Sequence, residues 1–227
     1  MAPARIDHTV TSGTFSLDGQ TFDVDNNVWV LGDDAECVVF DAPHDVAAIR
    51  RVVGDRRLVA ILATHGHDDH VRVAPDLADA TGAKIYLHPA DLPLWRLTHA
   101  ERRPSEELAD GQVIEVAGTR IEVIHTPGHA PGACCFYVAP GGGPPDPPNA
   151  SRGGMRDQAV LFSGDTLFQG GPGATGRSFS DFNLIIASIR DRLLTLPPET
   201  VVHTGHGPST TIGAEAPHLQ EWIDRGH

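Results

Sequence analysis

Short apolar runs alternate with turn residues along the first half of the chain and predict a strand-rich architecture. Strands are expected at 28–31, 37–40, 58–63 and 84–87. The first two are separated by Gly32-Asp33-Asp34, which is a turn signal. Helical spacing predicts helices at 45–53, 73–81 and 89–97, and glycines close the first two.

The second half repeats this pattern with a hairpin, more strands and two longer helices. Residues 112–116 and 119–125 form the expected hairpin around Ala117-Gly118, and further strands are expected at 134–139, 159–162 and 201–202. Helices are predicted at 181–194 and 213–225. The Gly/Pro-rich segment 140–158 cannot pack a core and is predicted to be a mobile loop. Strand-rich halves, each followed by helices, indicate two packed sheets with helices outside, in one domain over 1–227.

Composition narrows the class of partner. The 227 residues carry 17 basic and 30 acidic side chains, a formal charge of −13, which disfavours binding to nucleic acid. There is no apolar run of the roughly 18 residues that a membrane span needs, and the N-terminus lacks a secretory signal. We therefore expect a cytoplasmic protein that acts on a small molecule. The three cysteines are expected to be buried, reduced thiols, with the adjacent Cys134 and Cys135 on opposite faces of a strand.

The densest chemical signal is Thr64-His-Gly-His-Asp-Asp-His70, directly after a predicted buried strand. On an extended backbone His65, His67 and Asp69 would share a face, and His70 would point elsewhere. One short loop could then serve two adjacent metal ions. Imidazole and carboxylate ligands suit Zn, Fe or Mn.

Three further loops each carry one candidate ligand just beyond a strand: His129, Asp165 and His206. Each ligand has a glycine beside it, which permits close backbone approach to a crowded centre. Together with the first loop they supply seven ligands, enough for two ions with three ligands each and one shared.

The order His-x-His-x-Asp-His, His, Asp, His resembles the metallo-β-lactamase fold superfamily, and the resemblance spans residues 27–215. The stretches His125-Thr-Pro-Gly-His129, Gly164-Asp-Thr-Leu-Phe168 and Gly205-His-Gly-Pro208 resemble the glyoxalase II-like (hydroxyacylglutathione hydrolase-like) enzymes. The resemblance implies an α/β (α+β) fold, the four-layer αββα sandwich. β-Lactamases of this fold typically have a cysteine where this chain has Asp165, which disfavours that activity.

The resemblance also implies roles for individual residues. One ion would be held by His65, His67 and His129, and the other by Asp69, His70 and His206, with Asp165 shared between them. Asp41 matches an early aspartate that orients ligands; the alternative is a helix or turn cap before Pro43.

The implied activity is hydrolysis of an acyl-thiol or related ester by a metal-bound hydroxide, with Asp69 and Asp165 as catalytic residues. The implied cofactors are two divalent metal ions, for which zinc is expected and iron or manganese are the alternatives. Arg177 and Phe179, in the loop after Asp165, are candidate substrate contacts; alternatively, Arg177 is solvated or pairs with Asp181. The 169–179 loop departs from the relatives' short Gly-rich stretch, so the sequence does not identify the thiol of the substrate. The sequence also leaves the acyl group and the oligomeric state undetermined.

Three other activities of the same fold remain. A persulfide dioxygenase would hold one iron on His65, His129 and Asp165. A lactonase or other ester hydrolase is also compatible, whereas the negative charge disfavours a nuclease.

Overall fold

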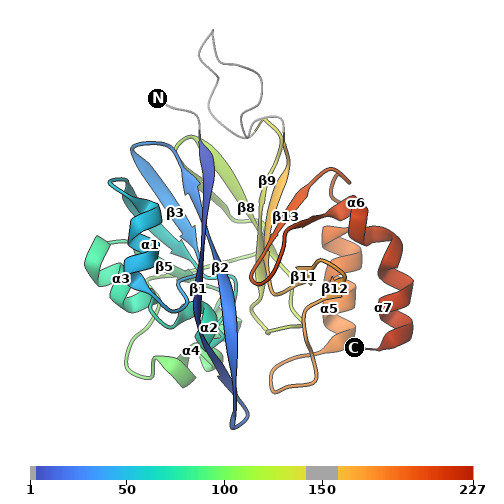
Figure 1. The fold of residues 1–227 in the computed structure, drawn as a ribbon. Helices are drawn as coiled ribbons and strands as arrows, with labels where there is room; N and C mark the ends of the chain where they lie inside the picture. Colours follow the sequence, from blue (N-terminus) through green and yellow to red (C-terminus); the bar gives the residue numbers. More distant parts are fainter. Residues whose placement is uncertain (1–3, 142–157, 227) are drawn as a thin grey trace.

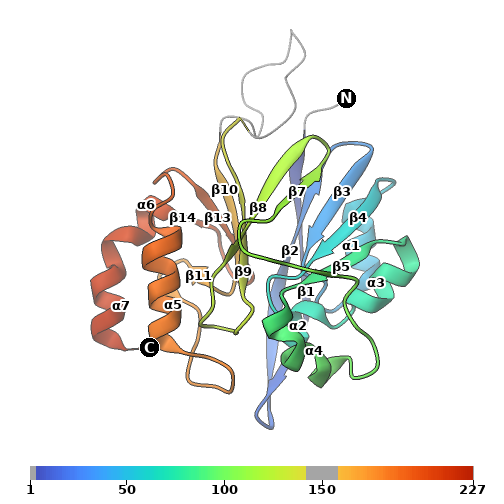
Figure 2. The same cartoon turned by 180° about the vertical axis from the view of Figure 1, so that it is seen from behind.

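The computed structural model describes residues 4–141 and 158–226. The interior of the predicted loop 140–158 lies outside these residues, so its mobility stays a prediction. Two six-stranded sheets face each other, and helices cover the outer face of each (Figures 1 and 2). This is the αββα sandwich expected from the sequence.

The first sheet has the order β1-β2-β3-β4-β5-β6 and is parallel from β3 onward. Its strands are β1 Arg5–Leu17, β2 Gln20–Gly32, β3 Glu36–Phe40, β4 Arg57–Leu62, β5 Lys84–Leu87 and β6 Glu106–Glu107. The helices of this half are α1 Val46–Val53, α2 Asp68–Val71, α3 Ala74–Thr81, the 3₁₀ turn η1 Pro89–Asp91 and α4 Leu92–Thr98.

The second sheet has the order β14-β13-β10-β9-β8-β7. Its strands are β7 Val113–Val116, β8 Thr119–His125, β9 Cys134–Val138, β10 Val160–Gly164, β13 Val201–Thr204 and β14 Thr210–Thr211, and β11 Leu167–Phe168 pairs separately with β12 Gly171–Pro172. The helices are α5 Phe182–Ser188, continued by a π-helical turn η3 Ile189–Leu193, then α6 Ile212–Glu215, the 3₁₀ turn η4 Ala216–His218 and α7 Leu219–Arg225.

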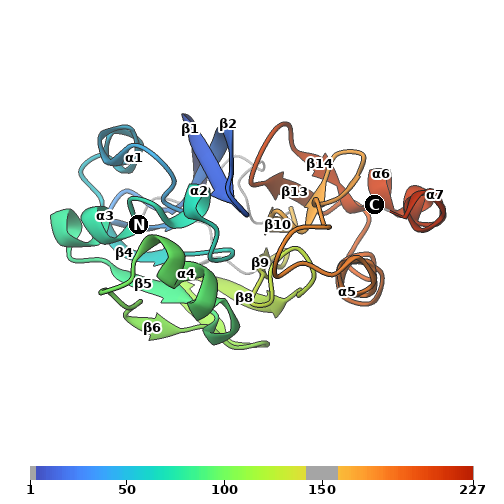
Figure 3. The same ribbon diagram turned by 90° about the horizontal axis from the view of Figure 1, so that it is seen from below.

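Alternation along the strands divides the apolar side chains between the layers. In β3, Val38 and Phe40 enter the core between the sheets, while Cys37 and Val39 pack with the helices of the first half. Phe40 stacks on Phe162 of the opposite sheet, with ring centroids 3.8 Å apart. The two packed sheets, seen from below in Figure 3, form the frame, and the loops that follow β4, β8, β10 and β13 carry the candidate ligands.

Most predicted elements are present, with one additional strand and one helix that is divided. The strand β1 was not expected: Arg5–Leu17 has few apolar residues, and it forms because its backbone pairs with β2 from Arg5↔Gly32 to Leu17↔Gln20. The predicted helix 213–225 is instead α6, η4 and α7, with Pro217 in the 3₁₀ turn, because proline lacks the N–H that a continuous helix needs.

Two smaller expectations concern the cysteines and the membrane. All three cysteines are free and buried, and Cys134 packs between the sheets while Cys135 faces the helices of the second half. Among the described residues, no helix has both the length and the apolar character needed to span a bilayer.

Candidate metal centre

The loop after β4 is only partly extended, contrary to the expectation for residues 65–70. His67 has an extended backbone and precedes α2, whose helical turn presents Asp69 and His70. A helical turn projects successive side chains about 100° apart, so Asp69 and His70 face one centre together. His65 and His67 still converge on each other, as the extended spacing predicted.

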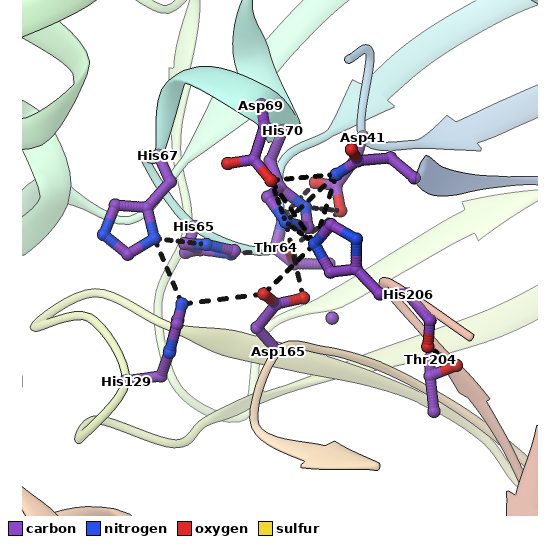
Figure 4. Close-up of polar contacts among 12 residues, drawn as sticks. Asp41, Thr64, His65, His67, Asp69, His70, His129, Asp165, Thr204 and His206 are labelled. Carbon is purple, nitrogen blue, oxygen red and sulfur yellow. Dashed lines mark hydrogen bonds and ion pairs between the residues drawn. The ribbon is translucent and has the colours of Figure 1, made fainter. Parts of the chain in front are cut away.

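Three imidazoles form the first ligand group, which we define as His65, His67 and His129. His67 Nδ1 lies 2.9 Å from His65 Nε2 and 3.1 Å from His129 Nε2. Figure 4 shows the three rings directed toward one another from two different loops. All three are buried, and burial lowers the pKa of each, that of His67 to about 3. They are neutral at pH 7, which is the form that binds a metal ion.

The second ligand group consists of Asp69, His70 and His206. His206 Nε2 lies 3.3 Å from both Asp69 Oδ2 and His70 Nε2. Burial alone would lower the pKa of His206 and of His70, but Asp165 and the other nearby carboxylates outweigh it and raise both, that of His206 to about 10. Burial would raise the pKa of Asp69, yet His70 and His206 bring it down to about 2.

Asp165 lies between the two groups (Figure 4). Its Oδ1 is 3.3 Å from His70 Nε2, and its Oδ2 is 3.4 Å from His206 Nε2 and 3.7 Å from His129 Nε2. Gly205 permits this approach, because a Cβ there would lie 2.2 Å from Asp165 Oδ1. One carboxylate therefore faces both groups.

The outer ring nitrogens give a test of whether a metal fits. Four of the five rings have an oxygen beside the outer nitrogen: Thr64 Oγ1 for His65 Nδ1, Asp41 Oδ2 for His70 Nδ1, Ala174 O for His129 Nδ1 and Asp25 O for His206 Nδ1. The outer nitrogen of the fifth ring, His67 Nε2, is buried without a partner among the described residues. An outer N–H donated to oxygen fixes the ring so that Nε2 faces the centre, as in metal-ligating histidines. In His70 and His206, whose pKa values are raised, Nε2 becomes a lone-pair donor when a metal ion displaces its proton. The residues present therefore fit divalent metal ions.

Asp41 holds the strand end and the ligand loop together. Its carboxylate accepts from Thr64 N at 2.7 Å, from Thr64 Oγ1 at 2.9 Å and from His70 Nδ1 at 2.8 Å. Its φ of 62° is unusual for a residue other than glycine and is typical of functional sites. The cap of the following helix is Asp45, so the cap alternative does not describe Asp41.

Asn26 contacts the second ligand group, although the sequence pattern does not single it out. Its Nδ2 donates to Asp69 Oδ2 at 3.1 Å and lies 3.3 Å from His206 Nε2, while its Oδ1 accepts from His44 Nε2 at 2.8 Å. The available signal was a pair of asparagines inside a buried strand, where asparagine is depleted.

A cavity of about 240 Å³ opens beside the two groups. Five candidate ligands line one side of it: His67, Asp69, His129, Asp165 and His206. The remaining lining residues are Phe15, Phe22, Val24, Ala174, Arg177, Ser178 and Ser180. The Arg177 guanidinium lies over Phe22, 4.5 Å from the ring centroid, and its buried Nη1 has no hydrogen-bond partner among the described residues. Phe179 is 44% exposed and is not among the lining residues, so its role stays a prediction.

Two relatives of the chain have names that describe hydrolases. The probable metallo-hydrolase YqgX of Bacillus subtilis (strain 168) is 30% identical over 203 residues, 83% of this chain and 88% of the relative. Hydroxyacylglutathione hydrolase GloC of Haemophilus influenzae is 30% identical over 174 residues, 71% and 74% of the two chains.

Solved structures share the fold over nearly the whole chain. BLEG-1, described as a B3 metallo-beta-lactamase, has a TM-score of 0.72 with 30% identity and covers 93% of this chain and 99% of its own. TTHA1623 in a di-iron-bound form has a TM-score of 0.66 with 32% identity, covering 91% and 96%. ETHE1 from Myxococcus xanthus has a TM-score of 0.68 with 20% identity, covering 95% and 89%, which shows the fold alone.

Residues 21–143 match the family described as the metallo-beta-lactamase superfamily. The sandwich, the His/Asp cluster at its edge and the similarity to YqgX agree with that match. The chain belongs to the metallo-beta-lactamase superfamily and has the fold of its metal-dependent hydrolases.

Proposed function

We propose that the protein is a binuclear metal-dependent thioester hydrolase of the glyoxalase II-like type. The observation that carries the proposal is Asp165, a single buried carboxylate within 3.7 Å of histidines from both ligand groups. A carboxylate in that position suits two ions that share it. Zinc is the metal we expect, with iron or manganese as alternatives, and the di-iron form of TTHA1623 shows that iron occurs in a similar protein.

The chain's own residues have three tasks. The first ligand group would hold one ion and the second group the other, with Asp165 shared. When bound, the ions supply polarisation of the substrate carbonyl and a water that ionises near neutral pH. Asp41 and the carbonyls of Asp25 and Ala174 keep the histidine rings turned toward the centre.

Asp69 is the residue we assign to proton handling. It lines the cavity, and the pKa of its carboxyl is about 2, so it is ionised at pH 7 and can accept a hydrogen bond from an attacking water. Asn26 Nδ2 donates to its Oδ2 and fixes its orientation. Asp165 would act beside it as the shared ligand of the two ions.

The chemistry of the leaving group favours a thioester as the substrate. A thiolate leaves readily and needs little help from an acid, and similarity to a hydroxyacylglutathione hydrolase supports the same class. Arg177 would pair with an anionic part of the thiol arm, since this side chain lines the cavity and its Nη1 has no hydrogen-bond partner within residues 4–141 and 158–226. Phe179 would flank an apolar segment of the substrate at the mouth. The partner is then a small acyl-thiol or ester, and we place the activity in the cytoplasm.

The test is hydrolysis of a panel of acyl-thiols by the zinc-loaded protein, followed by colorimetric detection of the released thiol. We expect turnover that Asp69→Asn reduces strongly, and little turnover of a β-lactam. The persulfide dioxygenase alternative would instead give oxygen uptake with a thiol persulfide and one iron per chain, held by His65, His129 and Asp165. That result, without thioester turnover, would replace the proposal.

A further inference from the structure

A buried carboxylate outside the candidate ligands connects the two loops of the first ligand group. Asp91 ends the turn η1 and is fully buried. Its Oδ2 accepts from Gly66 N at 2.7 Å, and its Oδ1 accepts from Gly132 N. Burial raises the pKa of Asp91 to about 6, although the two backbone N–H groups oppose the rise. Its contacts are therefore with backbone amides of two loops that are distant in sequence.

Both partners belong to ligand loops. Gly66 separates His65 from His67, and Gly132 follows His129 in the loop between β8 and β9. The loops leave different sheets: β4 is in the first and β8 in the second. The three imidazoles can converge only if these loops keep a fixed separation.

The two glycines are required by the approach of Asp91. A Cβ at Gly66 would lie 2.9 Å from Asp91 O, and a Cβ at Gly132 would lie 2.8 Å from Asp91 Cγ. Contacts below 3.0 Å would force the backbone to shift. Both loops are thus packed against the same residue as closely as their backbones allow.

We propose that Asp91 is a positioning residue that fastens the His65–His67 loop to the His129 loop and thereby sets the metal affinity of the first ligand group. This inference rests on the proposed metal centre but not on the thioester substrate. A first group made only of neutral imidazoles has no charge attraction to draw its members together, so the loops themselves must hold the geometry. Another backbone link, from Cys134 N to Thr64 O at 2.8 Å, lies where one loop leaves β4 and the other enters β9. Asp91 instead contacts Gly66, between the two histidines of the first loop, and Gly132, within the His129 loop.

Asp33 offers a matched control elsewhere in the chain. It is also a buried aspartate that accepts two backbone N–H groups, from Ala35 at 2.8 Å and Glu36 at 2.9 Å. Its partners lie within one local turn between β2 and β3, and it touches no ligand loop. Removing either carboxylate leaves two backbone donors without their acceptor, but only Asp91 joins ligand loops.

The experiment measures zinc affinity by chelator competition in a His70→Ala/His206→Ala background, where His65, His67 and His129 are the candidate ligand set that stays complete among the described residues. Asp91→Ala is expected to weaken zinc binding roughly 10–100-fold, the range seen when groups that orient ligands are lost. Asp91→Asn, which keeps one acceptor, should be intermediate, and Asp33→Ala should leave the affinity unchanged. Melting temperature is recorded in parallel, and both alanine variants are expected to lower it.

A further variant separates the position of the His129 loop from the charge of the Asp91 carboxylate. Gly132→Ala keeps the Asp91 carboxylate but pushes the His129 loop away, so it should also weaken zinc binding in the same background. In a His67→Ala background, where the first group is already incomplete, the Asp91 variants should have little effect on the remaining site.

Unchanged zinc affinity in Asp91→Ala, with a lowered melting temperature, would overturn the inference and leave Asp91 a stabilising residue only. An equal loss in Asp33→Ala would overturn it as well. Absence of thioester hydrolysis with the expected affinity changes would remove the proposed substrate but keep the role of Asp91. A wild-type chain that binds no divalent ion would contradict both.

Discussion

The two ligand groups differ in how their geometry is maintained. The first contains only imidazoles, all deeply buried, from loops of two sheets. The second includes a carboxylate, is surrounded by Asp41, Asp165 and Asn26, and is more open, with the side chain of His206 25% exposed. Charge attraction organises the second group within the protein, whereas loop packing must organise the first. The groups should therefore respond differently to the same kind of substitution.

The largest effect should follow from removing the carboxylate of Asp165, which faces both ligand groups. Asp165→Ala is expected to lower kcat/KM by at least roughly 10³-fold and to weaken both ions, because the carboxylate faces both. Metal content per chain and steady-state kinetics test this. Unchanged turnover would show that Asp165 is not shared.

Single ligand losses should then distinguish the groups. His67→Ala leaves two neutral imidazoles, whereas His206→Ala leaves His70 with two carboxylates nearby. We expect His67→Ala to weaken zinc binding roughly tenfold more than His206→Ala does. The reason is that the negatively charged carboxylates left in the second group partly compensate for the lost imidazole. Equal losses in chelator competition would mean that charge does not distinguish the groups.

A smaller effect is expected at the cavity wall. Arg177→Ala should raise KM for an anionic thioester roughly tenfold and change kcat little, the pattern of lost uniform binding. A small uncharged ester should be unaffected, and Arg190→Ala, which removes an exposed arginine paired with Asp191, is the control variant. Equal changes for both substrates would remove Arg177 from the site.

The smallest effect concerns His203, which belongs to neither ligand group. Its ring stacks on Trp29 at 4.1 Å, and burial lowers the pKa of His203 to about 4. The unfolded chain binds a proton below pH 6.5 and the folded chain only below about 4, so stability is lost as pH falls through that window. Between pH 7 and 4.5, the free energy of unfolding of the wild type should fall by about 1–2 kcal/mol more than that of His203→Phe. This value is smaller than the full pKa shift implies, because the ring is partly exposed to solvent.

Urea unfolding at the two pH values measures this difference. Parallel losses in both proteins would show that His203 does not contribute to the acid sensitivity.

The sequence predicted elements whose stability comes from apolar burial. The run 58–63 and the helix 73–81 appear as β4 and α3 because their apolar residues pack into the first core. The strand β1 could not be predicted in this way, because its stability comes from backbone pairing with β2.

The candidate ligands were visible in the sequence for a different reason. Histidine and aspartate at fixed spacing beside glycine mark a site even before the loops are placed. Asn26 and Asp91 carry no such spacing, since each acts through hydrogen bonds to residues that only the tertiary fold brings near. The short helix α2 leaves no signal in the sequence, because four residues are too few for a periodic pattern.

Metal content per chain, measured on the same sample as oxygen uptake with a thiol persulfide, tests the central claim most directly. The account predicts two divalent ions per chain in the wild type, fewer in Asp165→Ala, and no oxygen uptake. One iron per chain, accompanied by oxygen consumption that depends on the persulfide, would contradict the binuclear hydrolase.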